Sequence, residues 1–466
     1  MRYTLGIVLI VYSLIAVGQD NTVLTFSEYI DLVKENHPVM YQANLLDDMA
    51  ASTKRMARGG FDPKLEAEWN HKSFDDKNYY SVVSSAVKIP TWYGIDLKAG
   101  YDRNNGIFLN DSDEIPTRGL WNAGISVPLG KGLVIDNRRA ELKRADIFQS
   151  VTDQEQILII NQLLFNASTT YLAWQVSQMY LDIASEGLEL SIIRFDGTRQ
   201  SFINGDKPAI DTLESYISFQ TRQLDYQKAE QILENATLAL NNYLWIEGIT
   251  PLELADNTVP ENMDINLLRI TTDSLSLLQD QWLASHPELL LYEFKIADIN
   301  IDQRLAKEEI KPDVRINYNP LLGVANDALF DQFNANNYKL GATVSYPLMQ
   351  RKQRGKIQLN KIKIQDTEFE RTSKNQELAV KLNTYINNIR QAQRQYELLD
   401  ETVKNYNQML IAENRKLSVG ESSIFLVNSR ESKYLESRYK QVEASRKLLI
   451  NRFTYLLYSA RILEAI

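Results

Sequence analysis

The amino-acid sequence repeats itself, and this internal duplication constrains the fold more than any other feature. Short anchors recur in the same order in both halves of the chain, and such a recurrence indicates a repeated structural unit. The anchors pair Asn36-His37-Pro38 with Ser285-His286-Pro287, Phe61-Asp62-Pro63 with Ile310-Lys311-Pro312, Ala123–Leu129 with Ala342–Leu348, and Phe202–Gly205 with Leu417–Gly420. We therefore predict two structural repeats, 19–246 and 273–466, joined by a linker at 247–272.

Each repeat contains a long segment without proline, at 136–203 and at 351–418. A continuous helix over such a segment would be on the order of 100 Å long, which is typical of a coiled coil rather than of an ordinary globular helix. Apolar residues recur at spacings of seven, and sustained sevens indicate a left-handed supercoil with a partner helix. In the second repeat these residues are Leu382, Ile389, Tyr396, Val403, Leu410 and Leu417.

A glycine ends each long helix and marks a tight turn. Gly205 and Gly420 occupy equivalent places in the two repeats, and second helical stretches follow at about 208–246 and 421–463. Pro208 suits the first turn of such a helix, because the N–H that it lacks would have no partner there. We therefore expect two long helical hairpins per chain. Taken alone, the spacing of seven is explained by coiled-coil packing and implies no function.

Before each long helix, apolar and polar residues alternate, which predicts β-strands with one apolar and one polar face. The predicted strands are 65–70, 121–127, 314–319 and 340–346, with two extra runs in the first repeat at 79–89 and 93–103. Helical stretches at about 26–58 and 273–309 precede the strands in the two repeats. Alternation alone also fits a half-buried sheet in a soluble domain.

The first eighteen residues have the pattern of a secretory signal peptide. Arg2 precedes the apolar stretch Leu5–Val17, and Ala16-Val17-Gly18 resembles a cleavage site, so the mature chain is expected to begin near Gln19. Cleavage removes one of the 51 basic residues and none of the 60 acidic ones, so the formal charge of the mature chain is 50 − 60 = −10. No later stretch has the roughly 18 uncharged apolar residues of a membrane helix, so any membrane crossing is expected to take the form of a β-barrel.

Composition excludes several classes of function. The chain has no cysteine, which rules out disulfides, thiol catalysis and lipidation on cysteine. Its acidic balance argues against binding of nucleic acid, and three histidines leave little room for a metal site. His37 and His286 occupy matching positions before proline and are interpreted as helix-boundary residues. No motif places a nucleophile beside a base, so we predict no catalytic residue, no cofactor and no metal, and a protein that is not an enzyme.

The whole arrangement resembles the TolC-like family of outer-membrane efflux proteins. The resemblance rests on the paired helix turns at 36–38 and 285–287, the strand-to-helix junctions at Pro128-Leu129 and Pro347-Leu348, and the hairpin tips. It implies an α+β membrane fold, in which duplicated coiled-coil hairpins and a few strands per chain build a shared trimeric outer-membrane β-barrel and a periplasmic α-barrel. Each chain would supply four strands to a twelve-stranded barrel, and 247–272 would join a collar around the helical tunnel.

The resemblance also implies a function. The protein would be the passive exit duct of a tripartite efflux or type I secretion system, in the outer membrane with a large periplasmic part. A homotrimer would contact outer-membrane lipid and receive its substrate from an inner-membrane pump, powered by proton motive force or by ATP. A periplasmic adaptor would dock on the hairpin tips, which here are Asn204, Gly205, Val419 and Gly420.

Two acidic residues are candidates for the periplasmic entrance of the duct. Relatives commonly carry a ring of acidic residues just after a hairpin tip. Six and nine positions after Gly420, however, this chain has Leu426 and Ser429, which are not acidic. Asp211 and Glu214 occupy them after the first tip, so an acidic ring would come from the first repeat and would favour cations. The alternative is that both carboxylates only suit the first turn of a helix.

Aromatic residues in the predicted strands suit a membrane interface, where outer-membrane proteins carry aromatic girdles. The candidates are Trp69, Trp121, Tyr318 and Tyr346. The extra strand pair at 79–103 could lengthen an extracellular hairpin, thicken the barrel or fold over its mouth. The alternative function is a periplasmic coiled-coil adaptor or scaffold protein with a soluble β-domain, although such a protein would carry one hairpin rather than two.

Overall fold

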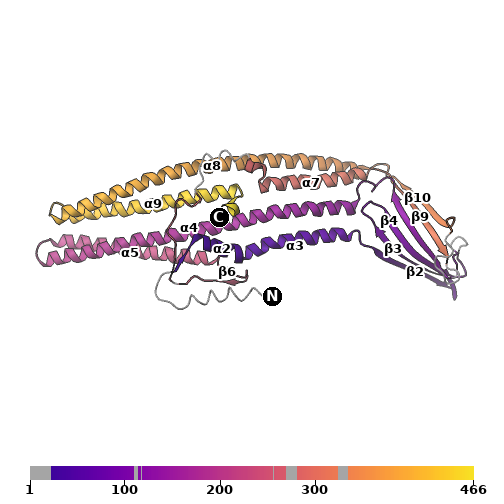
Figure 1. Cartoon of the computed structure of the whole chain (residues 1–466), viewed down its shortest axis with the longest axis horizontal. Helices are drawn as coiled ribbons and strands as arrows, with labels where there is room; N and C mark the ends of the chain where they lie inside the picture. The colour runs from indigo at the N-terminus through magenta and orange to yellow at the C-terminus, as the bar shows by residue number, and fades with distance from the viewer. Residues whose placement is uncertain (1–21, 110–113, 117, 256, 269–280, 324–333) are drawn as a thin grey trace. The chain divides into compact units, whose positions relative to one another are not determined.

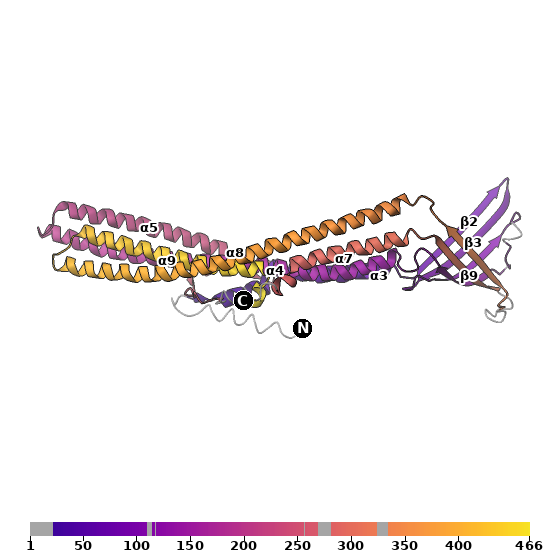
Figure 2. The same ribbon diagram turned by 90° about the horizontal axis from the view of Figure 1, so that it is seen from above.

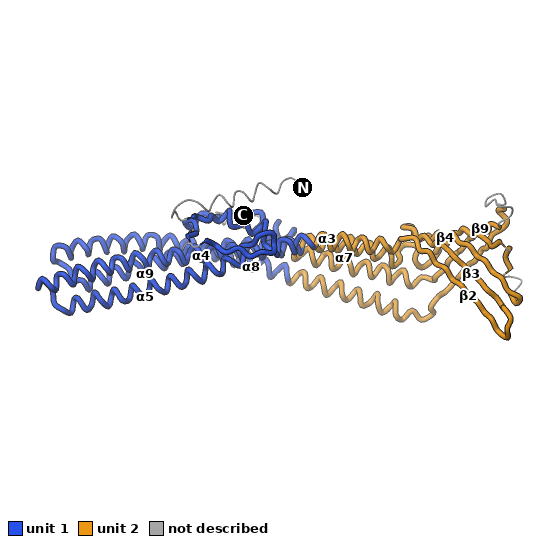
Figure 3. The backbone as a smooth tube through the Cα atoms, turned by 90° about the horizontal axis from the view of Figure 1, so that it is seen from below, with its two compact units in different colours: residues 1–45, 155–287, 374–466 blue, residues 46–154, 288–373 orange. Residues whose placement is uncertain are grey.

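The chain divides into two compact units, which Figure 3 shows in different colours. This computed structural model describes residues 22–109, 114–116, 118–255, 257–268, 281–323 and 334–466. Unit 1 combines 1–45, 155–287 and 374–466, and unit 2 combines 46–154 and 288–373. Each unit takes segments from both halves of the chain, so the units do not follow the boundaries of the predicted repeats. The predicted signal peptide lies outside the described residues.

Two helical hairpins dominate unit 1 (Figure 2). The first pairs α4, Asn137–Ile203, with α5, Ala209–Asn241, and the second pairs α8, Arg351–Ser418, with α9, Ile424–Tyr458; the first parts of α4 and α8 belong to unit 2. The predicted long helices are thus confirmed. Every residue of the predicted row at spacing seven in α8 is buried or partly buried, which is the burial that a coiled coil requires.

Both hairpins turn in the same way. Gly205 and Gly420 have φ angles of 82° and 81°, in the left-handed region that favours glycine. Each turn is a Schellman motif, in which two backbone N–H groups donate back to the end of the long helix. The bonds run from Gly205 to Phe202 at 3.0 Å and from Asp206 to Ser201 at 2.9 Å, and from Gly420 to Leu417 at 3.1 Å and from Glu421 to Lys416 at 2.9 Å. The two tips predicted to be equivalent are therefore closed by equivalent hydrogen bonds.

The core of unit 1 lies where the short helix α2, Phe26–Asn36, packs against α4, α5 and α9. Apolar side chains recur along α2 every three or four residues, and its Phe26, Tyr29 and Ile30 are buried. They meet Tyr171 and Trp174 of α4, with a ring-centroid distance of 5.4 Å between Phe26 and Tyr171. This aromatic cluster fixes α2 against the hairpins. None of the helices in the described part of the chain is long and apolar enough to span a membrane.

The segment 247–272 is more than a linker. It contains β7, Thr250–Pro251, which pairs with β6, Trp245–Ile246, and β8, Thr258–Pro260, which pairs in parallel with β1, Thr22–Leu24. The second helix of each hairpin is also shorter than predicted, because α5 ends at Asn241 and α9 at Tyr458, before the four-residue helix α10, Ile462–Ala465. The strands β1, β6, β7 and β8 have only two or three residues each, too few to show the alternation that marks longer strands, so the sequence did not predict them.

A capping box begins α2 and leads to the first prediction. The Thr25 hydroxyl accepts from the Glu28 N–H at 3.2 Å, and a Glu28 carboxylate oxygen accepts from the Thr25 N–H at 3.0 Å. Replacing Thr25 by Ala should lower the free energy of unfolding by about 1 kcal/mol, because a backbone N–H in the first turn of the helix loses its acceptor. Thermal unfolding followed by circular dichroism measures the loss, with Thr25→Ser as the control that keeps the hydroxyl. Equal melting of Thr25→Ala and the parent would contradict it.

The same cap gives a pH dependence with a definite sign. The backbone and side-chain hydrogen bonds from Thr25 hold the pKa of Glu28 below its usual value. A carboxyl with a lowered pKa stabilises the folded state at neutral pH and loses that contribution as the pH falls through the lowered pKa. The effect of Thr25→Ala on melting should therefore shrink in acid.

Unit 2 contains one six-stranded sheet (Figure 1). Its strands are β2, Lys64–Phe74, β3, Lys77–Pro90, β4, Asp96–Asn105, β5, Leu120–Pro128, β9, Asp313–Gly323, and β10, Tyr338–Ser345. Their order is β10-β9-β5-β4-β3-β2, and each neighbouring pair is antiparallel. The helices α3, Pro38–Gly59, and α7, Pro287–Glu308, lead into β2 and β9.

All six predicted strands are present, and the sheet has two strands more than the four per chain that the family resemblance implies. The resemblance implied four strands per chain, whereas β3 and β4 lie inside the same sheet as the other four. The extra pair is inserted between β2 and β5 and pairs with both of them. Of the predicted helical stretch 273–309, residues 273–280 lie outside the described residues, and α7 covers most of the remainder.

Candidate functional site

The tips of the two hairpins are exposed, as their predicted docking role requires. Val419 is 69% exposed, and a Cβ added to Gly205 or Gly420 would meet no atom within 4 Å. Large apolar side chains surround both turns in spite of their exposure. In the first hairpin these are Phe202, Ile203, Ile210, Leu213 and Ile217, and in the second they are Phe425 and Leu426. Exposed apolar side chains at a helical tip are typical of a surface that binds another protein.

The structure places the entrance candidates at the start of α5. Asp211 lies in the first turn of α5, and Glu214 follows it by about one turn; both are partly buried. Lys207 Nζ lies 3.9 Å from an Asp211 carboxylate oxygen and offsets part of its charge. A carboxylate at a helix start is also favoured by the helix dipole, so the structural explanation of Asp211 and the proposed entrance role are compatible.

A buried charged cluster joins the two hairpins, and the sequence did not predict it. Glu431 of α9 is 1% exposed and accepts a hydrogen bond from Arg194 of α4 at 2.5 Å. Arg222 of α5 approaches the other Glu431 carboxylate oxygen at 3.8 Å. Arg194 also donates to Asn428 at 2.7 Å, and Arg222 donates to Ser432 at 2.9 Å. One carboxylate thus holds cations from both helices of the other hairpin.

Further contacts between α4 and α9 lie beside this cluster. Arg438 donates to Glu186, and the Tyr180 hydroxyl donates to Glu443 at 3.3 Å. A Cβ added to Gly187 would lie 2.9 Å from the Leu435 side chain, so glycine allows the two helices to approach closely here. Gly187 is one of two glycines inside the proline-free helix α4, and a glycine at such a position is a sequence signal for a close helix crossing.

The six strands give the sheet one apolar and one polar face. Successive side chains of a strand point to opposite faces, and paired residues share a face. The strand registers place these exposed apolar residues on one face: Leu65, Trp69, Val83, Ile89, Leu97, Trp121, Ile125, Ile316, Tyr318, Tyr338, Leu340 and Val344. The other face carries Glu66, Glu68, Ser84, Lys98, Asp102, Asn122, Asn317, Asn319 and Lys339. So wide an exposed apolar surface is the mark of a contact with lipid or protein.

The predicted interface aromatics lie on or beside this apolar face. Trp121 is near one end of β5, where its ring centroid lies 4.9 Å from that of Tyr101, and Tyr346 follows the last residue of β10. Trp69 and Tyr318 lie in the middle of their strands instead, and Trp69 donates to Ser81 at 3.1 Å. Their positions along the strands therefore differ, and their assignment to a membrane interface stays a prediction.

The two matched histidines lie at helix boundaries, where the sequence placed them. His37 ends α2, and its Nδ1 accepts from the Val39 N–H at 3.1 Å; burial lowers the pKa of His37, which favours the neutral ring. His286 precedes α7 and is 2% exposed, and its Nε2 bonds to the Tyr458 carbonyl at 3.1 Å. Both rings therefore hold the backbone at a helix end.

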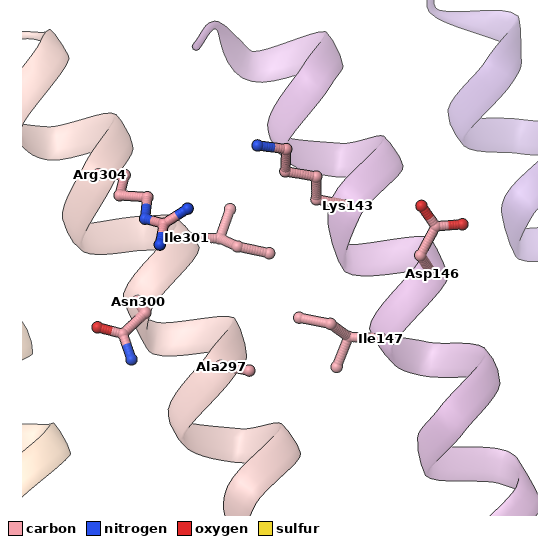
Figure 4. Close-up of a pocket in the computed structure, with 7 residues that line it drawn as sticks. All are labelled: Lys143, Asp146, Ile147, Ala297, Asn300, Ile301 and Arg304. Carbon is pink, nitrogen blue, oxygen red and sulfur yellow. The ribbon is translucent and has the colours of Figure 1, made fainter. Parts of the chain in front are cut away.

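The described residues form a groove between α4 and α7, but they form no group of side chains that could bind a metal ion. Figure 4 shows Ile147 of α4 and Ile301 of α7 facing each other across a groove of about 590 Å³, with Lys143 and Arg304 at the same gap. Ile301 and Ile147 also belong to the apolar cluster that packs α7 against α4. Among the described residues, no group of three or more His, Asp or Glu is placed to hold a metal ion. The groove is therefore a packing seam between two helices.

Two comparisons with known proteins, one of sequence and one of structure, both point to outer-membrane efflux channels. Residues 278–454 match the family model of outer membrane efflux proteins. The fold is similar to the open-state MtrE outer membrane channel of Neisseria gonorrhoeae, with 14% identity and a TM-score of 0.65 over 93% of this chain and 88% of that chain. It is also similar to the CmeC outer membrane channel of Campylobacter jejuni, with 11% identity and a TM-score of 0.62 over 93% and 85% of the two chains. A search of curated protein sequences finds no match.

These findings decide between the two predicted functions. The matching family is one of channels and not of enzymes, and the duplicated fold covers nearly the whole chain. The family match and the fold agree with the predicted outer-membrane efflux function and with the predicted outer-membrane location with a large periplasmic part, and they do not favour the adaptor or scaffold alternative. The predicted recognition agrees with both comparisons: residues 278–454 match the outer membrane efflux protein family, and nearly the whole chain has the fold of outer-membrane channels.

Proposed function

We propose that three copies of this chain form the passive exit duct of a tripartite efflux or type I secretion system. One observation carries the proposal: the chain combines a sheet with one lipid-compatible face and two long hairpins with matched, exposed tips. The apolar face of the sheet would contact outer-membrane lipid, and its polar face would line the water-filled path. The duct would perform no chemistry and need no cofactor, since transport would be driven by an inner-membrane pump.

The hairpin tips are the proposed docking site for a periplasmic adaptor. Asn204-Gly205 and Val419-Gly420 form the turns, and exposed apolar side chains such as Ile210 and Phe425 flank them. Helical partners bind through such apolar contacts at helical spacing. The signal peptide at 1–18, the repeats 19–246 and 273–466 and the equatorial role of 247–272 are parts of the same proposal.

Fractionation followed by native mass spectrometry in detergent tests the duct. The expected result is a protein of the outer membrane that needs detergent and has three times the mass of the mature chain. Loss of export of the cognate substrate in cells without the gene, restored by the parent chain, would complete the case. A water-soluble periplasmic monomer or dimer would overturn the proposal.

The acidic entrance makes a separate prediction. In the trimer, Asp211 and Glu214 would place several negative charges around a narrow opening, which favours cations. The double variant Asp211→Asn/Glu214→Gln should therefore lower the cation-over-anion permeability ratio of the purified channel, measured as a reversal potential in a planar bilayer. Glu234→Gln, an exposed change in the same helix α5, is the matched control. A ratio that the double variant leaves unchanged would assign both carboxylates to helix stabilisation alone.

A further inference from the structure

The inserted strands β3 and β4 are integral to the sheet. β3 pairs with β2 from Lys64↔Lys88 to Phe74↔Lys77, and with β4 from Ser81↔Asn105 to Pro90↔Asp96. β4 in turn pairs with β5 from Asp96↔Ser126 to Asp102↔Leu120. A hairpin that only extended a loop or covered an opening would leave β2 beside β5, whereas here both inserted strands separate them.

The inserted strands also repeat the two-faced pattern of their neighbours. Val83 of β3 and Leu97 of β4 are exposed on the apolar face, where Val83 lies opposite Trp69. Ser84 and Asp102 pair with each other on the polar face. A strand that faces lipid on one side and water on the other must alternate in this way. The side chains of β3 and β4 therefore suit strands of a barrel wall that separates lipid from water.

The polar face of the sheet has a cavity, and its lining residues come both from the inserted strands β3 and β4 and from the other strands of the sheet. A cavity of about 900 Å³ lies against this face. Its lining includes Ser84 of β3, Asp102 of β4, Asn122 of β5 and Asn319 of β9, and Asn122 donates to Asp102 at 2.8 Å. Inserted and original strands thus share one continuous polar surface.

The two outer edges of the sheet pair with no other strand in the described part of the chain. β2 and β10 are the edge strands, and every residue of β2 is exposed. Unpaired backbone groups in contact with lipid are strongly unfavourable, so such edges must be covered. An even number of strands makes the two edges run in opposite directions. The β10 edge of one copy can therefore continue the antiparallel order with the β2 edge of the next, and the occupant that fits each edge is a second copy of this chain.

We propose that each copy contributes six strands to the shared wall, so that three copies form one closed sheet of eighteen strands. This inference rests on the proposed trimeric duct and changes its dimensions. Because the diameter of a closed sheet grows roughly in proportion to its number of strands, the opening would be about one and a half times as wide as one with twelve. The extra hairpin then widens the exit and admits bulkier cargo.

Single cysteines test whether β3 belongs to the wall. The chain has no cysteine, so Val83→Cys and Ser84→Cys each introduce one thiol at adjacent positions on opposite faces. In outer-membrane vesicles, a water-soluble maleimide should label Ser84→Cys and should reach Val83→Cys only after unfolding in detergent. Equal labelling of the two variants in vesicles would overturn the inference, because a hairpin outside the wall has both faces in water.

A control pair separates this inference from the proposed duct. Ile125→Cys and Ser126→Cys occupy opposite faces of β5, which belongs to the wall whether a chain contributes four strands or six. If β5 alternates in labelling and β3 does not, the duct stands and the eighteen-stranded wall falls. If neither strand alternates, the duct itself fails. Images of the purified trimer should show eighteen strands, and twelve would contradict the inference directly.

Discussion

Replacing Glu431 by Gln should destabilise the hairpins by about 3 kcal/mol or more, because the change leaves the largely buried Arg194 without its counter-charge and leaves Arg222 with Asp225 alone. Glu431 is 1% exposed, and the Arg194 and Arg222 side chains around it are each 14% exposed. Removing one partner of such a cluster costs far more than removing an exposed pair. The melting temperature of the purified protein, followed by helical circular dichroism in detergent, should fall by several degrees.

The same change should also loosen the periplasmic end of the duct. Since Glu431 joins α9 to both α4 and α5, its neutralisation removes a tie between the two hairpins and should raise the resting conductance of single channels. Glu436→Gln is the matched control, because Glu436 is exposed on the same helix and pairs only with Lys433 and Lys440 in the described contacts. Adding Arg194→Gln to Glu431→Gln should recover part of the lost stability. A single variant that melts with the parent would show that the cluster does not join the hairpins.

The sequence predicted most of the helices and strands because their patterns are long and repeated. A proline-free segment with apolar residues at spacing seven over its whole length indicates one long helix rather than several short ones. The helix α8 ends at Ser418, as predicted. The strands were found because alternation over six or more residues is hard to produce in any other structure. The duplication strengthened both predictions, since Gly205 and Gly420 mark the same Schellman turn twice.

The remaining features depend on contacts that no local pattern records. Glu431, Arg194 and Arg222 each look like one more charged residue on a helix, and only the packing of three helices brings them together. The place of β3 and β4 in the sheet was also open, because alternation specifies two faces but not which strand lies beside which. Pairing between Asp96–Asp102 and Leu120–Ser126 settles that order, and with it the departure from four strands per chain.

A charge placed on the apolar face of the sheet should prevent insertion, whereas the same charge on the adjacent polar residue should be tolerated. Ile316 of β9 is 37% exposed between Val127 and Ala342, and Asn317 follows it on the other face between Ser126 and Gly341. Ile316→Arg would expose a guanidinium to hydrocarbon, at a cost of up to about 2–4 kcal/mol at mid-membrane depth, multiplied by three in a trimer. Asn317→Arg would face the water-filled path beside small neutral side chains.

The two arginine variants are best compared by the amount of folded trimer in the outer membrane. Ile316→Arg should leave little trimer and should appear as periplasmic aggregate, while Asn317→Arg should assemble at the level of the parent and change only the ion selectivity of the channel. Because the two positions are neighbours in one strand, a difference between them cannot come from backbone propensity or from the loss of a long helix. Equal assembly of both variants would mean that the apolar face does not meet lipid, and the twelve exposed apolar side chains on it would then have to be covered by protein.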